Sequence, residues 1–177
     1  DGQKHGRWVE WHPNGKLKSE GAYVDGKMEG RWVSYFDTGV KQIEGEYRAG
    51  LKQARSTQYY EEGQKNREEV HPAAGSREVQ WTAWRSDGKK WAEGTLIEHR
   101  AQGPYSEWHP NGALAVQGAY ANGEKAGEWK YWEIDGKPSA TPRRTAVRTT
   151  GVRPRAPDKA VELTGPGVKA ALDANGK

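Results

Sequence analysis

One eighteen-residue stretch occurs twice in this chain, and this repetition constrains the fold more than any other feature. Residues 6–23 read GRWVEWHPNGKLKSEGAY and residues 103–120 read GPYSEWHPNGALAVQGAY, with eleven of the eighteen positions identical. The copies lie 97 residues apart, which is four periods of 24 plus one inserted residue. Self-similarity at a fixed period is typical of repeat proteins, in which each unit stacks on its neighbours.

The sequence between the two copies follows the same period. Sliding the first copy by 24 residues aligns Trp8 with Trp32, and further steps identify about six repeats within residues 1–137. The third copy is degraded, because Ser56 stands where a Trp is expected, Glu69 where a Gly is expected and His71 where a Tyr is expected. Residues 71–79 are also irregular, and we expect the sheet to bend or loosen there.

Two turn signals occur in each repeat. HPNG places Pro and then Asn-Gly at the positions that a tight turn requires, and FDTG, YEEG, RSDG and EIDG are its relatives. The second signal is Asp25-Gly26, Asn122-Gly123 and, in degraded form, Ala49-Gly50. Turns therefore recur about every 12 residues with no helical periodicity between them. This pattern predicts an all-β fold, an elongated single-layer antiparallel meander of about six 24-residue hairpins.

The composition indicates an unusual core for such a sheet. Only 33% of the residues are hydrophobic and the mean hydropathy is −1.09, yet the chain has nine Trp and eight Tyr. An aliphatic two-layer core is therefore excluded, and aromatic rings have to supply the packing. The chain has no Cys and no run of about 18 apolar residues, so the sequence predicts neither disulfides nor a membrane-spanning helix.

The charge is unevenly distributed along the chain. Residues 138–177 contain eight basic and three acidic residues and no aromatic residue, while residues 1–137 contain 20 basic and 21 acidic residues. We therefore predict a repeat domain over 1–137 and a largely irregular, Pro/Thr/Arg-rich basic tail over 138–177. Within the tail, KAVEL could add an edge strand and VKAALDANG one or two helical turns, which would cap the last repeat. Asp1 lies inside a repeat, so we expect more protein upstream.

Strand periodicity sorts the side chains onto two faces. If HPNG is a four-residue loop, Trp11 lies opposite Lys16 and Arg7 opposite Glu20, and the Arg–Glu pair recurs as Arg31–Glu44 and Arg55–Glu68. Leu17 then lies on the packing face, where rings of one strand cover glycines of its neighbour. The predicted packing residues are Trp8, Trp32, Trp81, Tyr23, Tyr47, Tyr120, Gly21, Gly45 and Gly118.

A row of aromatic residues falls on the opposite, charged face. One position of the repeat is aromatic in all six copies, as Trp11, Tyr35, Tyr59, Trp84, Trp108 and Trp132. Aligned rings beyond the needs of a core indicate a surface that binds a partner. The alternative is that the rings simply cover the second face of the sheet beneath Lys and Arg side chains.

Catalytic and metal-binding patterns are weak. The chain has no Cys nucleophile, no G-x-S-x-G and no phosphate-binding glycine loop. Successive members of the row Glu20, Glu44, Glu68 and Glu93 lie two strands apart, about 10 Å, which favours a structural ladder over a hydrolase pair. His5 and His12 could share a metal, but exposed turn histidines are the preferred interpretation for His12 and His109. We predict no catalytic residue, no metal and no cofactor.

The whole pattern, G-x-W-x-x-Y/W, N/D-G, E-G-x-Y and D/N-G-K-x-x-G, resembles the MORN repeat family, and most closely the bacterial MORN variant. The resemblance rests on Gly6, Trp8, Trp11, Asn14, Gly15, Glu20, Gly21, Tyr23, Asp25, Gly26, Lys27, Gly30 and Trp32 and on their counterparts over 103–136.

The resemblance implies a docking scaffold made of hairpins. It favours another protein as the partner, in an antitoxin-like or bacterial envelope-associated role, with an anionic lipid or cell-wall surface as the alternative. The tail residues Arg143, Arg144, Arg148, Arg153 and Arg155 could assist contact with phosphates, but without interleaved aromatic residues they make nucleic acid a disfavoured partner.

Overall fold

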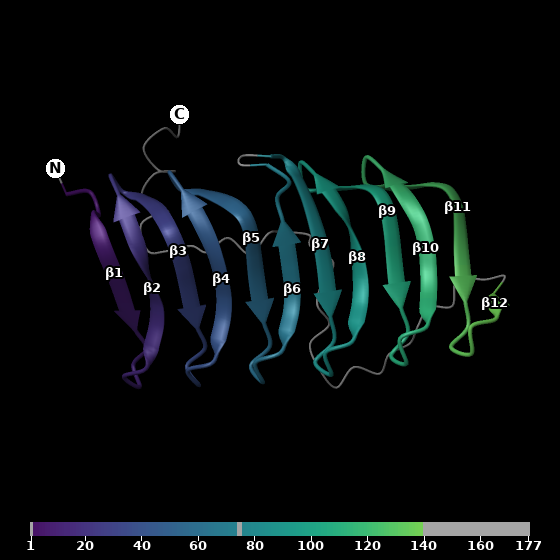
Figure 1. Cartoon of the computed structure of the whole chain (residues 1–177), viewed down its shortest axis with the longest axis horizontal. Helices are drawn as coiled ribbons and strands as arrows, with labels where there is room; N and C mark the ends of the chain where they lie inside the picture. Colours follow the sequence, from purple (N-terminus) through teal and green to yellow (C-terminus); the bar gives the residue numbers. More distant parts are fainter. Residues whose placement is uncertain (1, 74–75, 140–177) are drawn as a thin grey trace, which may run out of the picture. The chain divides into compact units, whose positions relative to one another are not determined.

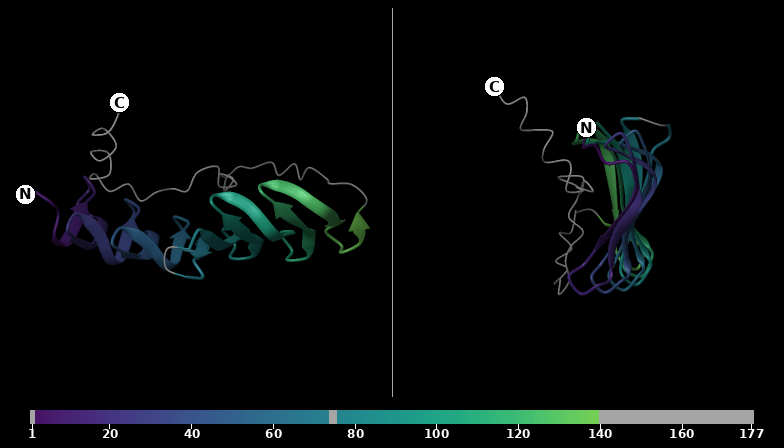
Figure 2. Two further views of the ribbon diagram at one scale, coloured as in Figure 1. Left: turned by 90° about the horizontal axis from the view of Figure 1, so that it is seen from above. Right: turned by 90° about the vertical axis from the view of Figure 1, so that its left-hand side faces the viewer.

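The computed structural model describes residues 2–73 and 76–139, and all strands within them belong to one antiparallel sheet (Figure 1). The twelve strands lie side by side in chain order, which confirms the predicted single-layer meander. The strands are β1 (Gly6–Trp11), β2 (Leu17–Val24), β3 (Lys27–Tyr35), β4 (Lys41–Arg48), β5 (Leu51–Tyr59), β6 (Lys65–Val70), β7 (Glu78–Trp84), β8 (Lys90–Ile97), β9 (Arg100–Trp108), β10 (Leu114–Ala121), β11 (Glu124–Trp132) and β12 (Pro138–Ser139). Figure 2 shows this layer from above and along the row of strands, where its twist is visible. No helix in the described part of the chain could cross a membrane.

Two-residue turns join the end of one repeat to the start of the next. Asp25 and Gly26 both have positive φ, 48° and 76°, which is the type I′ geometry that matches the twist of a hairpin. Ala49-Gly50 and Asn122-Gly123 adopt the same geometry, as their sequences predicted. The pair Glu98-His99 also does so, with φ of 50° and 66°. Sequence analysis missed this turn because it lacks glycine.

The predicted register within each hairpin was wrong. Trp11 pairs with Leu17, because the loop has five residues and is closed by His12 N–H, which donates to Lys16 O at 2.8 Å. A bulge follows, so Arg7 lies opposite Ala22 rather than opposite Glu20. The Arg7–Glu20 ion pair still forms diagonally, at 3.4 Å.

Leu17 consequently lies on a different face from the predicted one. Because it is directly opposite Trp11, it belongs to the charged face and not to the packing face. Lys16, which was expected opposite Trp11, lies in the turn and donates a hydrogen bond from Nζ to Thr38 O of the next repeat at 2.8 Å.

The packing face is built from rings that lie over glycines. A Cβ added to Gly21 would lie 2.2 Å from the Trp32 ring, and one added to Gly118 would lie 2.3 Å from the Trp129 ring. Tyr23 meets Trp32 edge-on with ring centroids 4.9 Å apart. The ring-to-ring contacts of this face form two groups, one of Trp8, Tyr23 and Trp32, the other of Trp81, Tyr105, Tyr120 and Trp129.

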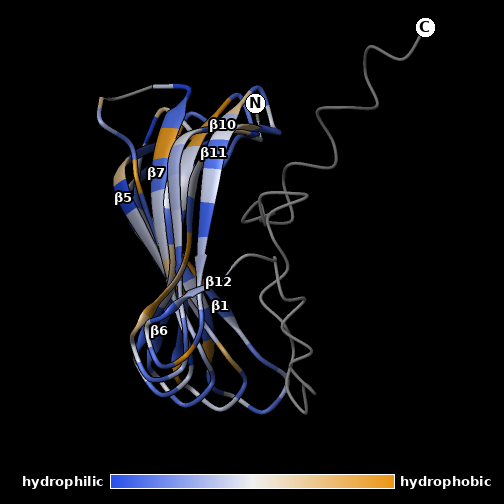
Figure 3. Cartoon of the chain, turned by 90° about the vertical axis from the view of Figure 1, so that its right-hand side faces the viewer, coloured by the Kyte–Doolittle hydropathy of each residue, from blue (hydrophilic) through white to orange (hydrophobic). Residues whose placement is uncertain are grey.

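Aliphatic residues also take part in the core, where Val33, Ile43, Ala83 and Ala92 are buried. Ala83 and Ala92 are buried beside Trp81, and the partly buried Trp91 and Leu96 pack against them, a contribution that sequence analysis did not single out. The hydropathy colouring of Figure 3 shows strands that are mainly hydrophilic with short hydrophobic segments. Among the described residues, four aromatic side chains thus share the buried core with four aliphatic ones.

The degraded third repeat does not interrupt the sheet. The β6–β7 ladder runs without a register shift from Arg67–Ala83 to Val70–Gln80, so strand pairing continues, over four residue pairs, where we expected the sheet to bend or loosen. At the other end, Pro138 and Ser139 pair with β11. The predicted segments KAVEL and VKAALDANG and the tail arginines lie outside the described residues, and the boundary at residue 137 stays a prediction.

Candidate docking face

One face of the sheet carries the whole predicted aromatic row, and we call it the docking face. Each of these six residues is the last residue of an odd-numbered strand from β1 to β11. Trp11, on the edge strand β1, is 63% exposed, and the other five are half-buried. The residues in this row are Trp11, Tyr35, Tyr59, Trp84, Trp108 and Trp132.

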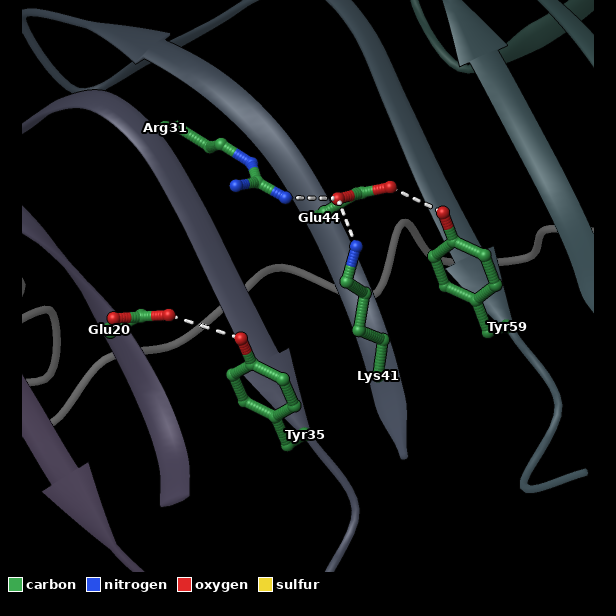
Figure 4. Close-up of polar contacts among 6 residues, drawn as sticks. All are labelled: Glu20, Arg31, Tyr35, Lys41, Glu44 and Tyr59. Atoms are coloured by element: carbon green, nitrogen blue, oxygen red, sulfur yellow. Dashed lines mark hydrogen bonds and ion pairs between the residues drawn. The ribbon is translucent and has the colours of Figure 1, made fainter. Parts of the chain in front are cut away.

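Two members of the row bind a carboxylate of the preceding repeat. Tyr35 Oη donates to Glu20 at 3.1 Å, and Tyr59 Oη donates to Glu44 in the same way one repeat later (Figure 4). Arg31 and Lys41 also reach Glu44, at 2.9 and 3.1 Å. These contacts assign Arg, Glu and Tyr to one face, as strand periodicity predicted.

The contacts of Glu44 and Tyr59 shift both of their pKa values. The Tyr59 hydroxyl and then Arg31 stabilise the carboxylate, and they lower the pKa of Glu44 to about 2 against the opposing effect of burial. Burial, followed by the hydrogen bond to Glu44, raises the pKa of Tyr59 to about 12. Glu44 is therefore held ionised, which is the opposite of what a general acid requires.

The next two members of the row are tryptophans, which have no hydroxyl group. Each of them contacts a lysine of the preceding repeat instead. Lys65 Nζ lies 5.6 Å from the ring centroid of Trp84, and Lys90 Nζ lies 4.9 Å from that of Trp108. Each lysine also pairs with a glutamate three residues later, at 3.0 Å in the first case and 2.9 Å in the second. Sequence analysis missed these lysines, although Lys-x-x-Glu recurs with the repeat period at 41–44, 65–68 and 90–93.

All four glutamates of the predicted ladder have cationic partners from their own repeat. Glu20 pairs with Arg7, Glu44 with Arg31 and Lys41, Glu68 with Arg55 and Lys65, and Glu93 with Lys90. The arginine side chains are 62–78% exposed, whereas the three glutamates that they contact are only 16–33% exposed. The outermost charges of the first three repeats are therefore guanidinium groups.

We predicted that the turn histidines are exposed. In the structure they instead connect neighbouring repeats. His12 Nε2 donates to Tyr35 O at 2.9 Å and His109 Nε2 donates to Trp132 O at 2.8 Å, and both rings are half-buried. Tyr60 and Arg85 bond in the same way to Trp84 O and Trp108 O, both at 2.8 Å. The turn of one repeat thus holds the backbone of an aromatic-row residue in the next.

The alternative of a metal shared by His5 and His12, which was not the preferred interpretation, has no assembled site here. His5 contacts Asp25 at 3.5 Å, whereas His12 bonds to the neighbouring backbone. Among residues 2–73 and 76–139, no three His, Asp or Glu side chains are grouped so that they could hold a metal ion. The predicted packing residues lie on the face opposite the docking face, where Tyr23, Trp32, Tyr47 and Trp81 are buried.

Comparison with known families supports the repeat assignment. Residues 4–25 and 28–49 match the family described as the MORN repeat variant, and these segments are the first two repeats of the sheet. No curated protein matches the chain.

Proposed function

This chain belongs to the MORN-repeat family, and from that premise we propose that it is a non-enzymatic scaffold that binds another protein through its docking face. The MORN repeat is a non-catalytic repeat type, and MORN repeats commonly serve as protein-binding or membrane-binding modules. The choice between these two partner classes rests on the residues of the face.

The aromatic row carries the proposal. Each ring-to-ring contact found in the described residues lies on the packing face. On the docking face, lysines lie over the rings of Trp84 and Trp108, and the hydroxyls of Tyr35 and Tyr59 contact carboxylates. No second layer of described strands covers the row. Hydrogen bonds from the preceding turn fix its backbone, so a partner meets rings that are already ordered. Trp and Tyr are the residues that most often dominate binding energy at protein interfaces.

The charges favour a protein over an anionic lipid surface. The cations of the face are engaged by carboxylates in a regular ladder, so they present no continuous positive patch. Because the guanidinium groups extend beyond the glutamates, the fitting partner presents carboxylates together with apolar side chains.

The test is a comparison of variants of the whole chain. A partner is first captured from native cells and identified, and its Kd is then measured with purified protein. Replacing Trp84 and Trp108 together by Ala should weaken binding at least about tenfold while circular dichroism shows a folded sheet. The control is Ile134→Ala, which removes an exposed apolar side chain from the last turn.

Two results would contradict the proposal. An unchanged Kd in the double variant would show that the row is not the binding surface, and an unfolded double variant would show that the row is core. Co-sedimentation with anionic vesicles in place of a protein partner would favour the lipid alternative. An antitoxin-like role and a place in the bacterial envelope are parts of this proposal that cell fractionation and neutralisation assays would test.

A further inference from the structure

On the packing face, the third repeat replaces its aromatic packing motif by polar residues. Glu69 lies directly between Ser56 on one neighbouring strand and Trp81 on the other. Gly21 and Gly118 stand at the position equivalent to Glu69 in the first and fifth repeats, and there the ring of the next Trp lies over the glycine. Because Glu69 occupies this space, Trp81 lies instead toward Gly94, with Cζ2 3.4 Å from the position of an added Cβ.

Two cations surround the Glu69 carboxylate. Arg67 Nε lies 2.9 Å from it and Lys52 Nζ lies 3.5 Å from it, and the three side chains are only 13–22% exposed. Burial favours the neutral acid, but Lys52 and then Arg67 outweigh it and lower the pKa of Glu69. The cluster therefore contains two positive charges and one negative charge, an excess of one positive charge.

Four buried polar atoms in this region have no hydrogen-bond partner. They belong to residues of β4, β6 and β7 and to the residue after β6, and they are Tyr47 Oη, Arg67 Nη2, His71 Nε2 and Trp81 Nε1. Tyr47 and Trp81 are only 6% and 8% exposed. Leaving a buried polar group unpaired costs about 1–3 kcal/mol, so each of these groups needs an explanation.

The chemistry of these atoms indicates an acceptor. Arg67 Nη2 and Trp81 Nε1 can only donate, and the hydroxyl of Tyr47 can donate as well. Tyr47 and His71 also line a hollow of about 470 Å³, whose other charged lining residues are Glu29, Arg31, Glu46 and Arg48. A ligand with a single negative charge and two acceptor oxygens would match both the excess charge and the free donors.

We propose that this cluster, the third-repeat site (Tyr47, Lys52, Arg67, Glu69, His71 and Trp81), binds the carboxylate group of a small monovalent acid. Arg67 and Lys52 supply the charge, and the Trp81 indole and the Tyr47 hydroxyl supply further donors. The site lies on the face opposite the docking face, so it goes beyond the proposed scaffold function. If the third-repeat site does not bind a carboxylate, protein binding by the docking face can still be tested, and the reverse also holds.

The Trp81 indole N–H is a direct reporter of the site. In proton–nitrogen NMR spectra of the whole chain, sodium acetate replaces sodium chloride at constant ionic strength, and Trp81→Phe identifies the signal. Acetate should shift the Trp81 signal downfield in a saturable way, as a new hydrogen bond forms. Absence of a shift, or a shift produced by phosphate but not by acetate, would overturn the proposal.

Paired substitutions distinguish the site from general charge effects. Arg67→Met should weaken acetate binding at least about tenfold, because a charge-assisted hydrogen bond is lost. Arg55→Met is the matched control, since Arg55 belongs to the same repeat but contacts Glu68 on the docking face, and it should leave the titration unchanged. An equal loss of acetate affinity in both variants would contradict the assignment.

Two further variants keep the test decisive if Arg67→Met does not fold. Tyr47→Phe removes only one hydroxyl and should weaken acetate binding about threefold to tenfold. Glu69→Gln removes the competing negative charge and should strengthen binding by a similar factor. Weaker binding in Glu69→Gln, or unchanged binding in Tyr47→Phe, would contradict the proposed arrangement of charge and donors.

Discussion

Gly21 and Gly45 occupy the same position in successive repeats but have different neighbours. A Cβ on Gly21 would lie 2.2 Å from the Trp32 ring, whereas a Cβ on Gly45 would lie 3.2 Å from Ser56 Cβ. Gly21→Ala should therefore destabilise the protein by about 1–3 kcal/mol through overpacking. Gly45→Ala should have a clearly smaller effect, because only the small side chain of Ser56 has to give way.

Urea denaturation of the two variants measures this difference directly. Equal loss of stability would mean that glycine is required for its backbone freedom at both positions, and not for the space that the ring of Trp32 occupies.

Also at the residue scale, Glu44 should make stability depend on acid pH. Its pKa is lowered from 4.5 to about 2 in the folded protein, so the folded state binds fewer protons than the unfolded state between these values. The stabilisation is fully present above about pH 4.5 and is lost as the pH falls toward 2. Glu44→Gln should therefore flatten the decline of stability over this range, as measured by urea denaturation at several pH values. A decline as steep as in the unmodified chain would contradict the assignment.

At the scale of elements, the hairpin turn between β8 and β9 contains avoidable strain. His99 has φ of 66°, a left-handed conformation, at the position that glycine occupies in the other three two-residue turns. His99→Gly should stabilise the protein by about 0.5–1 kcal/mol, because glycine adopts this conformation without a steric penalty. Thermal unfolding measures the gain.

Replacing the glycine of an equivalent turn is the control for His99→Gly. Gly123→Ala, at φ of 91°, should destabilise the protein. If His99→Gly were also destabilising, the histidine would make a contact that outweighs the strain of its backbone.

For the sheet as a whole, the third repeat should be the point at which the structure opens first. Glu69 takes the place of the glycine that a Trp ring covers at Gly21 and Gly118, and the ladder between β6 and β7 contains only four residue pairs. In a repeat protein, each unit gains stability mainly from its nearest neighbours. Amides of β6 should therefore exchange with solvent faster than paired amides of β3 and β9.

Hydrogen exchange followed by NMR or mass spectrometry checks this prediction. Uniform protection from β2 to β10 would show that the Lys52–Glu69–Arg67 cluster couples the repeats as strongly as the rings do.

Much of the fold could be predicted from local sequence alone. The 24-residue period, the Asp-Gly and Asn-Gly turns and the nine Trp of a chain that is only 33% hydrophobic determined a single sheet of hairpins, because turn chemistry and strand alternation act over a few residues. The same alternation separated Trp11 and its equivalents from Trp8 and its equivalents. It also placed Arg31 and Glu44 beside the aromatic row.

Only the tertiary structure decided the register and the contacts between repeats. The five-residue loop and its bulge place Leu17 on the docking face. No local rule distinguishes a four-residue loop made of HPNG alone from a five-residue loop that also contains Lys16. His12 and the lysines beside Trp84 and Trp108 took their roles from strands about 20 residues away in the chain. Trp81 lies toward Gly94 because Glu69 fills the space beside it, and that outcome depends on which side chains the assembled sheet brings together.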